Sequence, residues 1–316
     1  METILVTGAA GFIGSHMCDA LLEKNCRVIG VDDFNDYYDP KRKEQNIASA
    51  AKNKNFVLCR EDIRNGSGMD KIFQQNAPAK VVHLAARAGV RASLQDPQLY
   101  FSVNVDGTKC LLELCEKYNI KQFIFGSSSS VYGANTKVPF SESDPLTKTL
   151  SPYAESKSRA ELLCREFHQT HKLPIVCLRF FTVYGPRGRP DMAPYKFAKA
   201  ILEGKPIGQF GDGTSKRDYT YVGDIVDGIL SVMDKEIPFA IINLGNSHPV
   251  ALRDFIGAIE KIAGKKAMIK KLLTQPGDVP ITFADISLAQ KLLGFKPATS
   301  VEQGMKQTVA WLQNGE

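Results

Sequence analysis

The first half of the chain alternates short apolar runs with amphipathic stretches. The apolar runs predict strands at 3–7, 27–31, 56–59, 80–84 and 122–125, and the stretch after the first of them predicts a helix from Ile13 to about Lys24. Two later runs, at 175–179 and 240–243, predict further strands of the same sheet. Strands that alternate with helices form a parallel sheet covered on both faces, so the pattern predicts an α/β fold with a doubly wound parallel sheet.

The second half of the chain has prominent loops rich in glycine and proline. Two such stretches, at 184–190 and 209–213, have the composition of loops that suit a cap over a substrate. We therefore expect two domains. The first comprises residues 1–180 with a returning strand at about 239–244, and the second, smaller domain comprises about 181–238 and 245–316.

The composition is that of an ordinary globular protein of 316 residues, 43% hydrophobic and 23% charged. No apolar run approaches the roughly 20 residues of a membrane span, and the N-terminus lacks the basic and apolar regions of an export signal. The seven cysteines are odd in number and show neither a C-x-x-C pair nor a histidine at metal-binding spacing. We expect free thiols, no metal, no membrane association and a cytoplasmic location.

The net charge of +6 raises the question of nucleic-acid binding. The basic residues, however, occur in small separate groups such as Lys41-Arg42-Lys43 and Lys265-Lys266, without interleaved aromatic residues. Such groups are typical of solvated helix faces. The charge does not favour a nucleic-acid partner, and it suits a small anionic substrate equally well.

A glycine-rich turn follows the first predicted strand and opens the first helix. Gly8, Gly11 and Gly14 are spaced G-x-x-G-x-x-G, one residue longer than the standard dinucleotide fingerprint. Glycines let the backbone approach a pyrophosphate, which the N–H groups at a helix N-terminus bind. A purely structural turn is the alternative. Asp32, at the end of the second strand, is placed to accept both ribose hydroxyls and favours NAD over NADP, because it repels a 2′-phosphate.

Other residues at the carboxyl ends of predicted strands extend this site. Asp62 and Ile63 follow the third strand, where an adenine edge is expected, and the small residues of 84–86 follow the fourth, where a cofactor passes close to the backbone. The serine run 127–130 follows the fifth strand. A flexible linker is the other interpretation of such a run, but the flanking apolar residues favour a ligand-binding position.

Tyr153 and Lys157 are four residues apart in a predicted helix, downstream of the serine run. Residues at this spacing share one face of a helix, so the lysine ammonium favours the ionised form of the phenol. A free tyrosine titrates near pH ~10, and ionisation near pH ~7 needs about 4 kcal/mol of differential stabilisation. The spacing also arises by chance in exposed helix faces, so it predicts an acid/base pair only together with the other motifs.

With these motifs in this order, the chain resembles the extended short-chain dehydrogenase/reductases, and among them the NAD-dependent nucleotide-sugar epimerases. The stretches 104–108, 216–222, 275–280 and 283–285 also match this family. The resemblance implies a Rossmann-type fold with a smaller C-terminal substrate-binding domain, and Ser128, Tyr153 and Lys157 as catalytic residues. It further implies that NAD is bound by Gly8, Gly11, Phe12, Ile13, Gly14, Asp32, Asn35, Asp62, Ile63, Leu84, Ala85, Ala86, Asn104, Tyr153 and Lys157.

Within this family, the stretches 33–40, 180–186 and 187–192 are more similar to UDP-glucuronate 4-epimerases than to UDP-glucose 4-epimerases. The glucose enzymes usually carry asparagine at the position of Thr182 and often arginine at that of Gln275. The resemblance implies a UDP-sugar substrate, bound by Ser128, Ser130, Thr182, Arg189, Arg217 and Asp278.

A glucuronate carries a carboxylate that must be paired once water is excluded, which an arginine fork does best. Arg189 is our first choice for this partner, and Arg91 is a rival. The alternative to a carboxylate contact is that Arg187 and Arg189 are merely residues of an exposed loop. Arg217 is expected to contact the diphosphate.

The resemblance implies a reaction in which Tyr153 takes the proton of the sugar 4-hydroxyl while NAD accepts a hydride from C4 and later returns it to the opposite face. Lys157 would hold the ribose and stabilise the phenolate, and Ser128 would share the proton. Three alternatives stay open. They are a 4-epimerase for UDP-glucose or UDP-N-acetylglucosamine, a UDP-glucuronate decarboxylase, and an inactive NAD-binding sensor.

Members of this family commonly form homodimers through two helices of each subunit. The corresponding segments here are 99–117 and 153–168, in which Leu111, Leu112, Leu162 and Leu163 are candidates for the interface. Packing of these leucines onto the parent sheet is the alternative.

Overall fold

The structure is a computed structural model that describes residues 1–146, 148–273 and 279–315. The chain forms two compact units. The first comprises Met1–Gly133, Leu146–Arg179 and Ile229–Ile242, and the second comprises Ala134–Pro145, Phe180–Gly228 and Asn243–Glu316.

The two units differ from the expected domains in two segments. Residues 134–145 group with the second unit because the backbone of Phe140 bonds to Phe283 and Asp285, and Asn243 donates to the carbonyl of Phe140. Residues 229–238 group with the first unit because the carbonyls of Val232 and Met233 accept hydrogen bonds from the side chains of Gln122 and Lys80. The local sequence does not reveal these long-range bonds.

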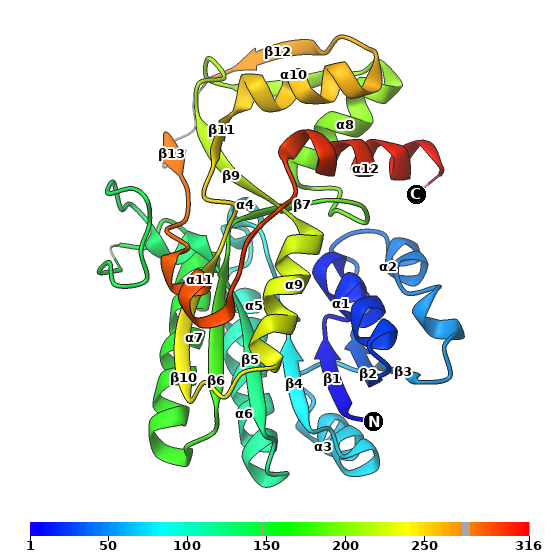
Figure 1. Ribbon diagram of the computed structural model, residues 1–316, viewed down its shortest axis with the longest axis vertical. Helices are drawn as coiled ribbons and strands as arrows, with labels where there is room; N and C mark the ends of the chain where they lie inside the picture. The colour runs from blue at the N-terminus through cyan, green and yellow to red at the C-terminus, as the bar shows by residue number, and fades with distance from the viewer. Residues whose placement is uncertain (147, 274–278, 316) are drawn as a thin grey trace. The chain divides into compact units, whose positions relative to one another are not determined.

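The first unit is built on a seven-stranded sheet with the order β10-β6-β5-β4-β1-β2-β3 (Figure 1). All seven expected strands are present, within a few residues of their expected ends. They are β1 (Thr3–Thr7), β2 (Arg27–Asp32), β3 (Phe56–Arg60), β4 (Lys80–His83), β5 (Gln122–Ser128), β6 (Ile175–Phe180) and β10 (Phe239–Leu244). The ladders that join β3, β2, β1, β4 and β5 are parallel, so these strands end at one edge of the sheet. The predicted α/β fold with a doubly wound parallel sheet is confirmed.

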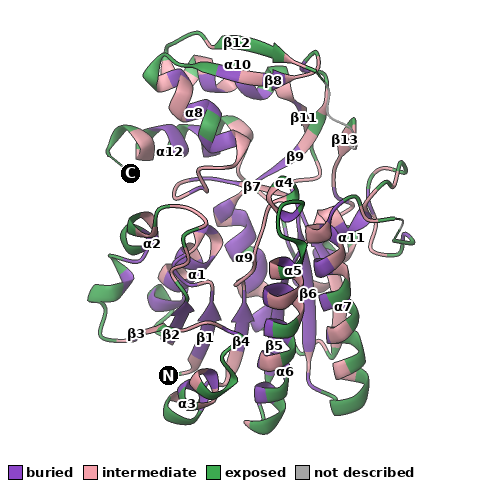
Figure 2. Cartoon of the chain, turned by 180° about the vertical axis from the view of Figure 1, so that it is seen from behind, coloured by how far each residue is buried: buried purple, intermediate pink, exposed green. Residues whose placement is uncertain are grey.

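Helices cover this sheet on both faces. One face packs against α3 (Gly66–Asn76), α6 (Gly107–Lys117) and α7 (Pro152–His171), whose apolar side chains form one cluster with those of alternate sheet residues. Helix α1 (Phe12–Glu23) packs against β1 and β2. The strands are largely buried, whereas the outer faces of α3, α6 and α7 are exposed (Figure 2). Shorter helical elements of this unit are α2 (Pro40–Asn46), η1 (Ala50–Lys52), α4 (Val90–Ser93), α5 (Pro97–Phe101), η2 (Ser102–Asp106) and η3 (Ser129–Tyr132).

The second unit has its own small sheets and core. Its elements include β7 (Thr182–Tyr184), α8 (Ala193–Glu203), β8 (Pro206–Phe210), β9 (Lys216–Tyr221), β11 (Pro249–Ala251), α10 (Leu252–Ala263), β12 (Met268–Leu272), β13 (Ile281–Thr282), α11 (Ser287–Leu293) and α12 (Val301–Gln313). The helix α9 (Val222–Met233) contains the boundary between the units. Strand β9 pairs with β7, β11 and β13, while β12 pairs with β8. The rings of Tyr219 and Phe255 stack at 4.0 Å in the core.

A buried carboxylate joins three segments of the second unit. Asp218, on β9, accepts hydrogen bonds from the backbone N–H groups of Asn246, Ser247 and Ala284 and from the hydroxyl of Thr220, at 2.7–3.0 Å. Burial raises the pKa of Asp218, and these donors oppose the rise. Asp218 therefore has a structural role. Its neighbour in the sequence, Arg217, is the residue of this stretch to which the resemblance assigns substrate binding.

Candidate functional site

The glycine turn between β1 and α1 leaves the backbone bare. A Cβ atom on Gly8, whose φ is +68°, would lie 2.8 Å from the backbone nitrogen of Ala85, and one on Gly14 would lie 2.0 Å from the carbonyl oxygen of Gly8. Gly11 is the N-cap of α1 and has no side chain to cap the first N–H groups of that helix. The turn thus fits a pyrophosphate, because its three glycines carry no side chain and the helix N-terminus favours an anion.

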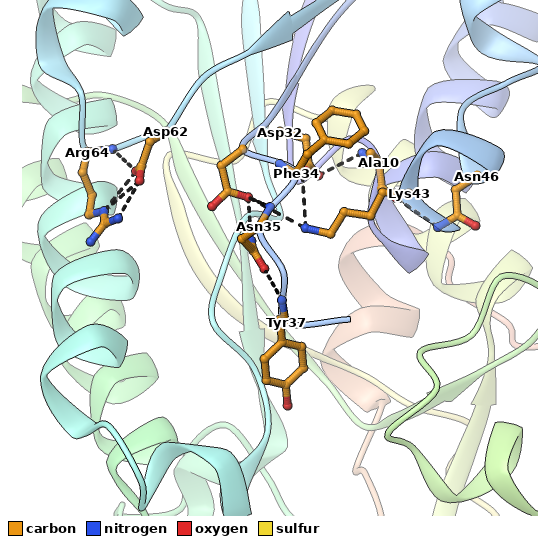
Figure 3. Close-up of polar contacts among 10 residues, drawn as sticks. Ala10, Asp32, Phe34, Asn35, Tyr37, Lys43, Asn46, Asp62 and Arg64 are labelled. Carbon is orange, nitrogen blue, oxygen red and sulfur yellow. Dashed lines mark hydrogen bonds and ion pairs between the residues drawn. The ribbon is translucent and has the colours of Figure 1, made fainter. Parts of the chain in front are cut away.

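Asp32 is buried at the end of β2 and bonds directly to the glycine turn (Figure 3). One carboxylate oxygen accepts from the N–H of Ala10 at 3.0 Å, and the other accepts from the N–H of Phe34 at 2.9 Å. Burial raises the pKa of Asp32, while Lys43 and these backbone donors oppose that rise. The oxygen that accepts from Ala10 can accept a further hydrogen bond, as from a ribose hydroxyl, whereas the oxygen that accepts from Phe34 also lies 3.5 Å from the Lys43 ammonium.

Lys43 is a partner of Asp32 that our sequence interpretation missed. Its ammonium lies 3.5 Å from Asp32 and 3.8 Å from Asp33, and the residue is only 4% exposed. The prediction that the 41–43 group lies on a solvated face is therefore wrong for Lys43, because α2 folds back over the end of β2. Asn46, one turn later, donates to the carbonyl of Ala10 at 2.9 Å and holds α2 against the glycine turn (Figure 3).

Two further predicted residues near Asp32 are engaged locally. Asn35 donates to Asp33 and accepts from the N–H of Tyr37. Asp62, just past β3, accepts several hydrogen bonds from Arg64, with a shortest distance of 2.6 Å (Figure 3). The hydrogen bond to the Arg64 side chain lowers the pKa of Asp62. Asp62 therefore presents a firmly ionised carboxylate, and Ile63 beside it is buried in the core.

Asn104 connects the loop after β4 to α7. It lies in the π-helical turn η2, which interrupts the helix expected over 99–117. Its side chain accepts from the N–H of Arg87 at 2.8 Å and donates to the carbonyl of Arg87 and the hydroxyl of Ser156, both at 2.9 Å. Since Ser156 precedes Lys157, this turn fixes the loop that follows Leu84, Ala85 and Ala86 against the helix that carries Tyr153. Such π-turns often occur at functional sites.

Tyr153 and Lys157 lie near the N-terminus of α7. The helix begins there because Ser151 caps it, accepting from the N–H of Ala154 at 3.1 Å, and Pro152 occupies its first position. The Tyr153 ring meets the ring of Tyr100 edge to face at 6.2 Å. Lys157 is 3% exposed and donates to the carbonyl of Gly126 at 2.7 Å. Burial lowers the pKa of Lys157 to about 8, which places its titration within the working range of an acid/base site.

The serine run lies at the end of β5 and continues into η3. The hydroxyl of Ser128 accepts from the N–H of Ser130 at 3.2 Å and from the hydroxyl of Ser130 at 3.0 Å. Ser127 points the other way and donates to Glu161 at 2.6 Å. The run is therefore ordered by its own hydrogen bonds and forms part of the folded first unit.

The described residues of the second unit that we predicted to bind the substrate lie on β7, on β9 and in the loop after β7. Thr182 is half-buried on β7 and pairs with Tyr219 of β9. The guanidinium of Arg189 forms a two-point bond with the carboxylate of Asp191, at 2.9 Å through Nε. This geometry is the one with which arginine binds any carboxylate. Arg217 is half-buried and donates to the carbonyl of Lys216, and Asp278 and Gln275 lie outside the described residues.

The four leucines proposed for a dimer interface are in different environments. Leu111 and Leu112 are fully buried in the core cluster on the sheet, so their assignment to an interface is wrong. Neither leucine can reach a second subunit, because both lie on the face of α6 that packs against the sheet. Leu163 packs partly against the same cluster, whereas Leu162 is 52% exposed on α7.

Known proteins resemble the chain over its whole length. The model of the NAD dependent epimerase/dehydratase family matches residues 4–245. The chain belongs to this family. Among its relatives, a UDP-glucuronate 4-epimerase of Thermodesulfobacterium geofontis is 44% identical over 312 residues, which cover 98% of this chain and 96% of the relative.

Solved structures of epimerases match this family member closely. The UDP-glucuronic acid 4-epimerase of Bacillus cereus, in complex with UDP-glucuronic acid and NAD, is 42% identical with a TM-score of 0.93, and 99% of each chain is covered. The UDP-glucose 4-epimerase of Thermotoga maritima, with UDP-glucose, is 33% identical with a TM-score of 0.91 and the same coverage.

The described residues include neither a candidate metal cluster nor a helix suited to cross a membrane. No group of three or more His, Cys, Asp or Glu side chains among them is placed to hold a metal ion. Over the same residues, no helix combines the length and apolarity that crossing a membrane requires. All seven cysteines are free thiols.

Proposed function

We propose that this protein is an NAD-dependent UDP-sugar 4-epimerase that interconverts UDP-glucuronate and UDP-galacturonate. The observation that carries the proposal is its full-length likeness, at 42–44% identity, to UDP-glucuronate 4-epimerases, one of them in complex with UDP-glucuronic acid and NAD. The lower identity of 33% to a UDP-glucose 4-epimerase makes glucose the second choice.

The residues of the first unit suit NAD. The bare turn of Gly8, Gly11 and Gly14 suits its pyrophosphate, and Asp32 suits its adenosine ribose, where the buried carboxylate would repel a 2′-phosphate. When bound there, NAD supplies reversible hydride acceptance. The small side chains of Ala85 and Ala86 leave room beside the turn for the cofactor.

Tyr153 is the proposed acid/base. It accepts the proton of the sugar 4-hydroxyl and later returns a proton to the same oxygen. Lys157 favours the phenolate through its positive charge, and Ser128 donates a hydrogen bond to that oxygen while Ser130 orients the Ser128 hydroxyl. Because the 4-hydroxyl changes only its configuration, the reaction needs no net acid or base.

Arg189 is the proposed partner of the sugar carboxylate. A 4-keto glucuronate is a β-keto acid, and it loses CO₂ when its carboxyl bond aligns with the carbonyl π system. A two-point bond to a guanidinium fixes the plane of a carboxylate, as the bond between Arg189 and Asp191 illustrates. In this proposal the sugar carboxylate either binds Arg189 together with Asp191 or takes the place of Asp191. Thr182 and Arg217 are the proposed contacts to the sugar and the diphosphate, respectively, and Asp278 completes the proposed set.

Product analysis tests the proposed function. Purified protein is incubated with UDP-glucuronate, and in a separate sample with UDP-glucose, without added NAD, and the products are followed by ¹H NMR. We expect UDP-galacturonate, because NAD that is regenerated in each turnover stays bound. A UDP-pentose would indicate decarboxylation instead, and conversion of UDP-glucose in preference to UDP-glucuronate would indicate the glucose epimerase.

We also propose that the protein acts in the cytoplasm as a homodimer. Leu162, exposed on α7, supports the dimer, since a large apolar side chain on an outer helix face is suited to contact a second copy. Light scattering at micromolar concentration tests this, with Leu162→Glu as the disrupting variant. A monomeric wild type would refute the homodimer.

A further inference from the structure

Glu161 is a buried carboxylate directly behind the proposed catalytic residues. It follows Lys157 by four residues and Tyr153 by eight, so all three lie along one stripe of α7. The residue is 3% exposed, and Arg179 of β6 binds it at two points, with Nε at 2.9 Å and Nη2 at 2.7 Å. The guanidinium of Arg179 also lies over the ring of Tyr132 at 4.7 Å.

The stripe holds the end of β5 at two consecutive residues. Lys157 donates to the carbonyl of Gly126 at 2.7 Å, and Glu161 accepts from the hydroxyl of Ser127 at 2.6 Å. The next residue is Ser128, the proposed partner in proton transfer. The position of Ser128 relative to α7 is thus determined by both hydrogen bonds, one of which depends on the Glu161 carboxylate.

Lys157 has few charged neighbours that can keep it protonated. The groups that face it are Tyr153, Glu161 and Cys164 from α7, Cys177 from β6, His83 from β4, and the ring of Phe125 and the carbonyl of Gly126 from β5. Burial lowers the pKa of His83 to about 3, so that ring is neutral, and burial raises the pKa of the Cys177 thiol. Among these groups, Glu161 is the carboxylate, and it forms a two-point ion pair with Arg179.

We propose that Glu161 is a positioning residue for the reaction, which keeps Lys157 positively charged and holds the end of β5 that carries Ser128. This inference rests on the proposed function for its catalytic meaning. Arg179 orients the Glu161 carboxylate through its two-point bond. The Glu161 carboxylate thereby opposes the effect of burial, which lowers the pKa of Lys157 to about 8.

The test is the titration of Lys157 itself. The protein is labelled with [6-¹³C]lysine, and the Lys157 signal is assigned by its loss in Lys157→Met. In Glu161→Gln we expect the titration midpoint to fall by roughly half a pH unit or more, about a threefold change in the ionisation ratio, because a carboxylate is lost and the Arg179 cation is left uncompensated. The same substitution at Glu166, exposed on the same helix, should leave the midpoint unchanged.

Activity gives a second reading of the same titration. The alkaline limb of the kcat profile with UDP-glucuronate should move to lower pH in Glu161→Gln and remain in place in Glu166→Gln. A purely structural role would lower kcat at all pH values without moving the limb. If the wild type did not epimerise UDP-glucuronate, the proposed function would fail, but the NMR titration would still decide the role of Glu161.

A second variant covers the case in which Glu161→Gln does not fold because Arg179 is left unpaired. Glu161→Gln/Arg179→Met removes both charges, and the new amide oxygen can still accept from Ser127. Its Lys157 midpoint should still lie below that of the wild type, but by less than in the single variant, because the Arg179 cation that opposes the carboxylate is removed with it. A midpoint equal to that of the wild type, in the single variant or in this one if the single does not fold, would overturn the proposal.

Discussion

The pair of Lys43 and Asp32 allows a quantitative test of how the cofactor end of the fold is stabilised. Lys43→Met removes the ammonium but keeps an unbranched apolar stem of similar length. Removing one partner of a buried ion pair typically costs about 3–5 kcal/mol, since the other charge stays buried. Here the separation is 3.5 Å, and Asp32 keeps two backbone N–H donors. We therefore expect a loss of about 2–3 kcal/mol in the free energy of unfolding at neutral pH.

The assay is urea unfolding with a matched control. Lys41→Met makes the same substitution at an exposed position of α2 and should change the free energy of unfolding by less than about 0.5 kcal/mol. The double variant Asp32→Asn/Lys43→Met leaves neither charge buried, so it should be more stable than the sum of the two single changes. Equal effects of Lys43→Met and Lys41→Met would refute the account of a buried, paired Lys43.

The pH dependence of Lys43→Met has a definite sign. The pKa of Asp32 in the folded state is raised above its ordinary value by burial, so this carboxyl lowers stability as the pH rises from the unfolded pKa through the folded one. Without Lys43 the folded pKa rises further, and the loss extends to higher pH. The difference between wild type and variant should therefore shrink towards acid pH, where the carboxyl is neutral in both, and a constant difference would contradict this explanation.

Three further predictions concern the glycine turn and the proposed catalytic residues. Gly14→Ala places a Cβ 2.0 Å from the Gly8 oxygen, so we expect lost nucleotide binding and destabilisation of about 3 kcal/mol or more, measured by thermal unfolding with and without NAD; unchanged NAD affinity would argue against the pyrophosphate site. Tyr153→Phe should reduce kcat by at least about 10²-fold while bound NAD, assayed after denaturation, remains; loss of NAD would indicate a structural tyrosine. Arg189→Ala should weaken UDP-glucuronate binding by about 1.5–3 kcal/mol in calorimetry, with a smaller effect on UDP-glucose; equal losses for both sugars would exclude a carboxylate contact.

The sheet was predictable from the sequence because its central strands are buried on both faces. Each strand appears as a continuous apolar run, and the glycine turn and Asp32 mark the ends of the first two. The end of β5 was likewise placed correctly, since its serines follow an apolar run directly. These features depend on local sequence, which a single chain reveals.

Residues whose role depends on tertiary packing were not predictable in this way. Lys43 belongs to a basic triplet that is typical of a solvated face, and its burial follows only from the return of α2 over β2. Glu161 and Arg179 are 18 residues apart on different elements, so their pairing leaves no local pattern. Leu111 was assigned to a possible interface because an apolar residue on a helix does not reveal which neighbour covers it.

The central claim is that the sugar is transiently oxidised at C4 and reduced again within one binding event. Incubation of UDP-[4-²H]glucuronate with the purified protein, in ordinary water and without added NAD, tests it directly. The account predicts UDP-galacturonate that retains the deuterium at C4, because the hydride removed from that carbon returns to its opposite face. UDP-galacturonate with ordinary hydrogen at C4, or the absence of UDP-galacturonate, would contradict it.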